Sequence, residues 1–162
     1  YSLRFGRSGR IMRAYLSGGM EYAANDGGDW REMLQQFLEE ELHHEVFNPT
    51  AKSKELFATK YENVDFRKLK FENIKRYTEI VRELVEIDCE EIAQRTDYVI
   101  CYWDESAAKG AGTKGELTMA KYFGKPVYLV TEISLQEIPG WVLGCCTEVF
   151  GSYEEMKKRL SR

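Results

Sequence analysis

The segment from Lys109 to Glu116 (KGAGTKGE) has the residue types of a ligand-binding loop. Its glycines let the backbone approach a ligand closely, and a helix that follows offers free N–H groups and a partial positive charge. Glu116 lies at the expected helix start, where the helix dipole holds a carboxylate ionised, as a nucleophile or a partner for a developing cation requires. The alternative is that Glu116 only complements the helix terminus, and the loop by itself does not choose between the two.

Short apolar runs and helical periodicity define the elements that would position this loop. In the first half of the chain we expect a strand at 11–17 before Gly18-Gly19, a helix at 30–42, a brief strand at 44–47 and a helix at 72–93. Residues 50–70 are polar and weakly periodic, which predicts a long loop or a broken helix.

The second half of the chain has the order of a βαβ unit. We expect a strand at 98–102, a glycine turn at 110–115, a helix at 116–123, a strand at 126–130, a last strand at 148–150 and a helix at 152–160. This order predicts a doubly wound α/β fold with a parallel sheet. Ligands bind beyond the carboxyl ends of such strands, so the loops at 17–19 and 103–115 are the expected walls of a crevice.

Composition limits the classes of function. The 162 residues, 43% hydrophobic and 31% charged, fit one globular domain, expected at 11–162, with 1–10 as a disordered arm or an expression remnant. No apolar run approaches the roughly 20 residues of a membrane span, and the net charge of −4 argues against a nucleic-acid polymer as partner. The four cysteines form no CxxC pair and the two histidines lack partners at metal spacing. We therefore expect no metal, no cofactor, a cytoplasmic location with reduced thiols, and a small-molecule ligand.

Three further segments follow one another in a fixed order: RAYLSGGM near the start, IDCEEIAQRTDYVICYW in the middle, and GAGTKGELTMAKYFGKPVYLV after it. Together they resemble the nucleoside 2-deoxyribosyltransferase family, over about Ile11 to Val130. The resemblance implies a flavodoxin-like, Rossmann-like fold and an enzyme that cleaves the N-glycosidic bond of a nucleoside, by transfer to another base or to water. Relatives in the same family cleave nucleoside 5'-monophosphates, so a nucleotide is also an expected substrate.

The resemblance assigns roles to three residues. Glu116 falls on the nucleophile that attacks the anomeric carbon, Tyr15 on the tyrosine that steadies it, and Asp88 on the aspartate that handles protons on the base. An aspartate in a pocket poor in water can have its pKa raised enough to protonate a leaving base. From the residues alone, Tyr15 is better interpreted as a core aromatic, and an exposed helix carboxylate competes as the interpretation of Asp88.

Substrate contacts are expected from both walls of the crevice. The residues concerned are Ser17, Gly18, Gly19, Trp103, Gly110, Gly112 and Thr113. For a 5'-phosphate, Ser106 and Lys114 would join them, although turn and cap roles are commoner for such residues.

Two positions depart from the family. Gly110 replaces an aspartate that contacts sugar hydroxyls, and Glu148 replaces an asparagine contributed by a neighbouring subunit, so the resemblance implies a homo-oligomer.

Two other functions fit the same residues. A nucleotide-binding or sensor module would keep the crevice without turnover, which the missing loop aspartate would explain. A phosphoribohydrolase acting on nucleotides shares the glycine turn before a glutamate, but the upstream arginine and proline-glycine context is lacking. The sequence leaves open the base, the sugar, the 5'-phosphate, and the choice between transfer and hydrolysis.

Overall fold

The computed structural model describes residues 10–162, so the arm expected at 1–10 lies outside it except for Arg10, which hydrogen-bonds to Asp97. Five parallel strands form one sheet in the order β2-β1-β3-β4-β5. Their bounds are Arg13–Gly18 (β1), Glu45–Phe47 (β2), Tyr98–Tyr102 (β3), Val127–Val130 (β4) and Glu148–Phe150 (β5). The predicted doubly wound α/β fold is confirmed, and the strand order reverses between β1 and β3, where such sheets bind ligands.

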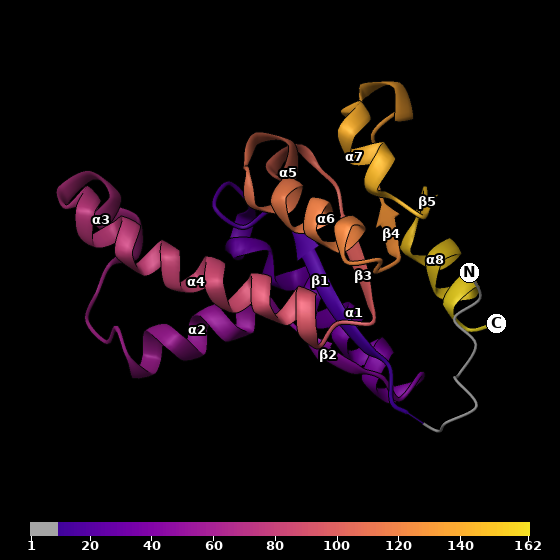
Figure 1. The fold of residues 1–162 in the computed structure, drawn as a ribbon, viewed down its shortest axis with the longest axis horizontal. Coiled ribbons are helices and arrows are strands. Elements are labelled where there is room, and N and C mark those ends of the chain that lie inside the picture. The colour runs from indigo at the N-terminus through magenta and orange to yellow at the C-terminus, as the bar shows by residue number, and fades with distance from the viewer. Residues whose placement is uncertain (1–9) are drawn as a thin grey trace.

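Helices cover both faces of the sheet (Figure 1). The helices are α1 (Gly28–Glu40), α2 (Pro49–Thr59), α3 (Phe66–Glu72), α4 (Ile74–Gln94), α5 (Glu105–Lys109), α6 (Gly112–Tyr122), α7 (Gly140–Cys145) and α8 (Tyr153–Leu160), with short 3₁₀ turns at Ala24–Gly27 and Leu135–Glu137. One core cluster packs α1 and α8 on the sheet, and the other packs α4, α6 and α7 on the opposite face. The sheet is therefore the middle layer of three, and its strands are buried because apolar helix stripes cover both sides.

The stretch predicted as a long loop or a broken helix is a broken helix. Its first part, α2, is capped by Asn48, whose side chain accepts from the Thr50 amide at 3.1 Å, and its second part, α3, is capped by Asp65. Figure 1 shows α2, α3 and the first half of α4 extending together away from the sheet. Capping residues therefore form helices where apolar periodicity is weak, since they satisfy the free amides of a first turn.

The glycine loop differs from the prediction. We expected residues 103–115 to be irregular and the helix to begin at Glu116, but α5 occupies Glu105–Lys109 and α6 already begins at Gly112. The sequence does carry the signal for α5, because Asp104 caps it by accepting from the Ala107 amide at 3.0 Å. For α6, the glycines indicated a turn because glycine is a weak helix former, and tertiary contacts override that preference.

Within residues 10–162, no helix is long and apolar enough to cross a membrane. The same residues contain no group of three or more His, Cys, Asp or Glu placed to hold a metal ion.

Candidate active site

Glu116 lies on α6 and points its carboxylate at β1. The Tyr15 hydroxyl donates a hydrogen bond to one carboxylate oxygen, and the Ser17 hydroxyl donates to the other at 2.9 Å. Side chains two apart on a strand face the same side of a sheet, so β1 presents both donors together. The carboxylate is thus fixed by two hydroxyls at the carboxyl end of the strand next to the switch point.

The environment of Glu116 is not that of a helix start. Because α6 begins at Gly112, Glu116 is its fifth residue and lies beyond the reach expected for the helix dipole. Burial raises the pKa of Glu116, and the hydrogen bonds from Tyr15 and Ser17 oppose this rise, together with the positive charge of Arg31. The ionised form therefore depends on side-chain donors rather than on the helix terminus.

Asp88 approaches the same place from α4 and is half-buried. Burial raises the pKa of Asp88 from its ordinary 3.8 to about 8, and the charge of Glu116 adds to the rise, while Arg31 and a hydrogen bond with Tyr15 oppose it. A carboxyl with this pKa holds its proton at neutral pH. Two neighbouring carboxyls with different environments are the arrangement in which one serves as an acid while the other is ionised.

Tyr15 combines the two roles considered from sequence. Its side chain is fully buried and stacks on Phe47 with ring centroids 5.3 Å apart, so it is a core aromatic. Its hydroxyl also reaches Glu116, and burial followed by the charge of Glu116 raises the pKa of Tyr15 well above 10.0. Tyr15 therefore keeps its proton and acts as a hydrogen-bond donor rather than as a base.

Arg31 is a site residue that sequence reasoning missed. Its guanidinium is fully buried and donates to four backbone carbonyls, those of Leu16, Gly18, Gly19 and Gly27, at 2.9 to 3.3 Å. Burial lowers the pKa of Arg31, and the charge of Glu116 opposes this. Arg31 thus shapes the loop after β1 and places positive charge near both carboxyls. In sequence it looked like an ordinary charged residue of an amphipathic helix, since nothing in its spacing marks a buried cation.

The two predicted walls of the crevice contact each other. A side chain at Gly19 would place its Cβ 2.9 Å from the Ala107 amide nitrogen, and one at Gly18 would come within 3.1 Å of the Tyr102 carbonyl oxygen. The Cβ at Gly18 would also lie 2.7 Å from the Trp30 ring. Distances below 3.0 Å are too short for a Cβ, so both positions favour glycine because the loop after β1 lies directly on α5, Trp30 and the end of β3. Ser17, just before them, is fully buried, and its hydroxyl donates to Glu116.

The glycines of the second wall are open. A Cβ at Gly112 would meet nothing within 4 Å, and one at Gly110 would touch Ser106 and Tyr22 only at 3.5 and 3.9 Å. Backbone at these positions can be approached by a ligand. Thr113 is 3% exposed, so its backbone amide is better placed for a ligand than its hydroxyl.

Trp103 does not have the environment expected of a substrate-stacking residue. It is 1% exposed and belongs to the core cluster beneath α6 and α7, because the strand end it follows is covered by those helices. The two residues considered for a 5'-phosphate already have partners: Ser106 donates to Asp104 at 2.5 Å and Lys114 donates to the Ala108 carbonyl at 2.7 Å.

The fold and this cluster define a flavodoxin-like α/β protein with two neighbouring carboxyls at the switch point of the sheet. Two solved structures share the fold. One is a 2-deoxyribosyltransferase from the psychrotolerant bacterium Bacillus psychrosaccharolyticus, with a TM-score of 0.56 and 17% identity over 90% of each chain. The other is the CMP N-glycosidase of Clostridium botulinum, with a TM-score of 0.51 and 18% identity over 93% of this chain and 99% of that one. No protein-family model and no curated protein matches the chain.

Proposed function

We propose that this protein is an enzyme that cleaves the N-glycosidic bond of a nucleoside or nucleotide. The observation that carries the proposal is the pairing of Glu116, held by the hydroxyls of Tyr15 and Ser17, with Asp88, whose pKa is raised to about 8. N-glycosidic cleavage by double displacement uses a carboxylate at the anomeric carbon and an acid at the leaving base, and these two side chains supply one of each.

The reaction proceeds in two steps. In the first, a Glu116 oxygen forms a bond to the anomeric carbon as the bond from that carbon to the base nitrogen breaks, and the base takes its proton from Asp88. In the second, water or another base attacks the anomeric carbon and releases Glu116, while Asp88 recovers a proton from the attacking group. This is the double displacement of retaining glycosidases, with a purine or pyrimidine as leaving group.

Two further lines support the proposal. Both fold neighbours are enzymes of nucleoside or nucleotide chemistry, one a 2-deoxyribosyltransferase and one a CMP N-glycosidase. The residues that the family resemblance singled out, Tyr15, Asp88 and Glu116, come from three elements far apart in sequence and lie together here. Convergence of those three side chains is not required by the fold alone, because a fold hosts many functions.

The test is release of free base, measured by liquid chromatography with ribonucleosides, deoxyribonucleosides and their 5'-monophosphates, each with and without a second free base. Glu116→Gln keeps the shape of the side chain and removes the nucleophilic charge, so we expect base release to fall by at least about 10³-fold. Glu105→Gln, an exposed carboxylate on α5, is the matched control and should leave release unchanged. Binding without release from any compound would instead favour a nucleotide sensor.

The same panel settles the class of substrate. Because Ser106 and Lys114 already form hydrogen bonds within their own loop, we expect these two side chains to contribute little to the binding of a 5'-phosphate. Monophosphates turned over much faster than nucleosides would contradict this and indicate phosphate binding by backbone amides. Exchange of one base for another distinguishes transfer from hydrolysis.

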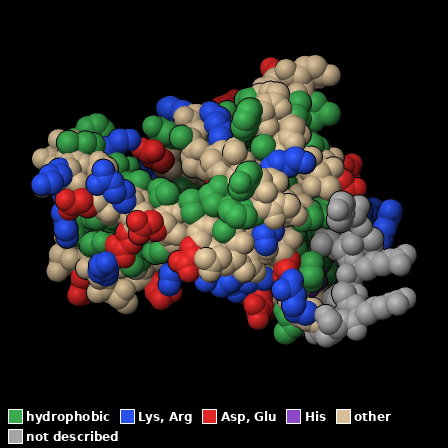
Figure 2. Space-filling view, in the orientation of Figure 1, with side chains coloured by type: hydrophobic (Ala, Val, Ile, Leu, Met, Phe, Trp, Pro, Cys, Tyr) green, Lys and Arg blue, Asp and Glu red, His purple; other side chains and the backbone are tan. Residues whose placement is uncertain are grey.

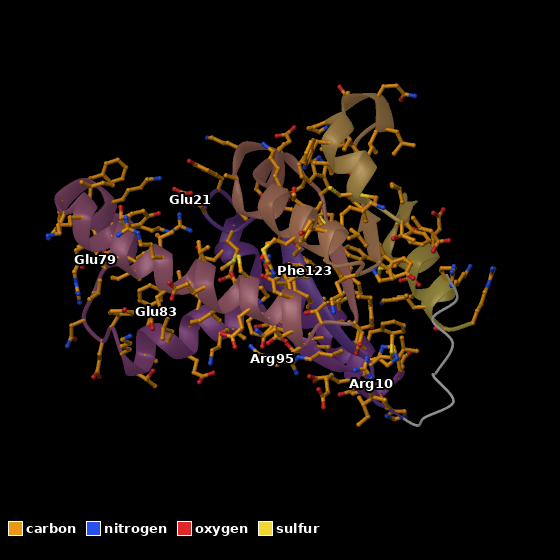
Figure 3. The ribbon with its side chains drawn as sticks, in the orientation of Figure 1. Arg10, Glu21, Glu79, Glu83, Arg95 and Phe123 are labelled. Atoms are coloured by element: carbon orange, nitrogen blue, oxygen red, sulfur yellow. The ribbon has the colours of Figure 1, made fainter. Side chains whose placement is uncertain are left out.

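We further propose that the protein is a cytoplasmic homo-oligomer. Tyr122 is 84% exposed, Trp141 is 70% exposed and Phe123 is 46% exposed, and the rings of Tyr122 and Phe123 contact each other at 5.2 Å. Figure 2 shows hydrophobic side chains gathered near the end of α6, where Figure 3 labels Phe123. Exposed aromatic side chains that lie together favour contact with another protein surface. The four cysteines are free thiols, as in a reducing compartment.

A further inference from the structure

A cavity of about 690 Å³ lies between the loop after β1 and the extension formed by α2, α3 and the first half of α4. Its volume is that of a pocket for a small molecule. Five aromatic side chains line it: Tyr22, Phe57, Phe66, Phe71 and Tyr77. Aliphatic side chains of Val81 and Leu84 on α4 continue the apolar wall.

The aromatic wall is held by its own ring contacts. Phe66 packs against Phe57 with centroids 4.9 Å apart and against Tyr77 with centroids 4.7 Å apart, so one ring joins α2, α3 and α4. Lys70 lies over the Tyr77 ring at 5.6 Å and Lys109 over the Tyr22 ring at 4.6 Å. Rings fixed in this way form an apolar wall that needs no further ordering, which favours binding of another apolar group.

The charged residues at the cavity favour a neutral ligand. Arg67 pairs with Asp26 and also donates to the Glu21 carbonyl at 3.0 Å, while Lys70 pairs with the Glu21 carboxylate at 2.5 Å. These pairs link α3 to the loop after β1, and Figure 3 shows Glu21 on the side of that loop toward α3. The lining carries three cations, with Lys54 as the third, and three acids, with Asp65 as the third, so its charges balance. Because two of the cations already have carboxylate partners, the cavity is a poor place for a phosphate and a suitable one for an uncharged aromatic group.

The cavity adjoins the proposed acid. Leu84 lines it, and Asp88 is four residues further along α4, so the two side chains lie on one face of the helix, one turn apart. Tyr22 also lines the cavity, and its ring is the neighbour that a Cβ at Gly110 would meet at 3.9 Å. The cavity wall therefore ends one helical turn from the acid, and it shares Tyr22 with the surroundings of the glycine loop.

We infer that this cavity receives a bulky apolar or aromatic substituent carried by the leaving base, so the preferred substrates have a modified base. The inference rests on the proposed function, because it takes Asp88 as the group that protonates the base. A base held at Asp88 has the sugar on the side of Glu116 and its far edge toward Leu84. A substituent on that edge enters the space between the aromatic rings.

The test compares bases with and without a benzyl group on the exocyclic nitrogen. Base release is measured for adenosine and N6-benzyladenosine, for cytidine and N4-benzylcytidine, and for the deoxyribosides and 5'-monophosphates of all four. Burial of the added ring should raise kcat/KM by at least about tenfold for one or both pairs. In parallel, binding of the free bases N6-benzyladenine, adenine, N4-benzylcytosine and cytosine is measured by calorimetry, with at least about tenfold tighter binding expected for a benzylated base.

Two substitutions on α2 make the comparison specific to the cavity. Ser53 lines it, so Ser53→Phe fills the space and should reduce the benzyl preference in kcat/KM and in binding to about twofold or less. Ala58 is exposed on the same helix and is not among the lining residues, so Ala58→Phe should leave the preference as it is in the unmodified protein. Val81→Phe fills the cavity from α4 and replaces Ser53→Phe if that variant does not fold.

The outcomes separate the inference from the proposed function. Turnover of simple nucleosides with no benzyl preference, in rate or in binding, overturns the inference and leaves the proposed function standing. Tighter binding of benzylated bases that Ser53→Phe abolishes, without base release from any compound, supports the cavity as a binding site and removes the proposed function. A preference that both Ser53→Phe and Ala58→Phe leave unchanged shows that the ring binds elsewhere and overturns the inference.

Discussion

At the scale of single residues, the proposed chemistry depends on the balance between Glu116 and Asp88. One carboxyl receives hydrogen bonds from two hydroxyls, whereas the other has a pKa raised to about 8 by burial and by its neighbour's charge. The ionised form of the first discourages ionisation of the second, because like charges in a partly buried site repel. Division of labour between the two thus follows from their environments, although both are ordinary acids in sequence.

This balance predicts the pH dependence of the reaction. Asp88 must be protonated to act as an acid, so kcat/KM should fall by a factor of about ten per pH unit above about 8. Glu116 must be ionised, and because its pKa is raised, the low-pH limb should lie above its ordinary value of 4.5. Initial rates of base release between pH 4 and 10 measure both limbs. A rate that stays constant between pH 7 and 10 would contradict the role of Asp88.

The raised pKa of Asp88 also predicts an effect on stability. Between about 4 and about 8 the folded state holds a proton on Asp88 that the unfolded state has lost, so this group makes the protein less stable as pH rises through that window. Asp88→Asn removes the titration, so its free energy of unfolding should exceed that of the parent. This difference should grow as pH rises through the window, by at most about 1.4 kcal/mol for each pH unit. Urea unfolding of both proteins at pH 5 and pH 8 measures this difference. The same variant, Asp88→Asn, should also lose kcat/KM by a factor of about 10² to 10⁴. An equal difference at both pH values would show that Asp88 is ionised throughout.

At the scale of elements, the loop after β1 and the start of α6 differ in how much space surrounds their glycines. Gly18 and Gly19 are glycine because neighbouring backbone and side chains leave no room for a Cβ, whereas Gly112 and Gly115 face open space. Open space beside a helix start is where a substrate would lie. The glycines after β1 are therefore needed for packing, whereas Gly112, the first residue of α6, leaves the backbone accessible at the helix start, and Gly115 lies almost one turn further along the helix.

The two open glycines give a matched pair of substitutions. Gly115→Ala should stabilise the protein by about 0.5 to 1 kcal/mol, because alanine favours the helix, and should leave kcat/KM unchanged. Gly112→Ala should not lower stability, but its methyl group should reduce kcat/KM by at least about tenfold if substrate approaches the backbone there. Thermal unfolding and base-release rates of both variants provide the measurements. Unchanged rates for Gly112→Ala would remove this glycine from the substrate site.

At the scale of the whole molecule, the aromatic side chains named here fall into three groups with different surroundings. Tyr15, Tyr98 and Tyr128 are buried in the central layer, a second group lines the cavity beside α2 and α3, and a third lies exposed near the ends of α6 and α7. Burial accounts for the first group, and the inferred ligand would account for the second. The rings of the third group stay largely exposed within residues 10–162, although the Trp141 indole donates to the Thr118 hydroxyl at 2.8 Å, and this exposure supports contact with another copy of the chain.

The exposed group predicts a measurable oligomer. Light scattering coupled to size-exclusion chromatography should give a mass that is a multiple of 18.9 kDa. Tyr122→Lys places a charge among the exposed rings and should shift the protein toward the monomer, whereas Lys125→Gln, at a nearby half-buried position, should not. A monomeric parent protein would contradict the proposed assembly.

The sequence by itself determined the layered fold, since short apolar runs alternating with amphipathic helices have few ways to bury their surfaces. All five strands and the long helix α4 lie within a few residues of their expected positions. The motif also indicated Glu116 as a residue to examine, because glycines before a carboxylate are visible in a local stretch of chain. Local pattern is sufficient for these features because they depend on neighbours in sequence.

Only the tertiary structure decided what surrounds each side chain. It placed Trp103 in the core, gave Glu116 two hydroxyl partners from β1 instead of a helix terminus, and revealed Arg31 as a buried cation bound to four carbonyls. The cavity beside Asp88 likewise arises from α2, α3 and α4 meeting a loop some 30 to 60 residues earlier in the chain. Burial, pKa and cavities are properties of groups brought together from distant positions, so no local pattern contains them.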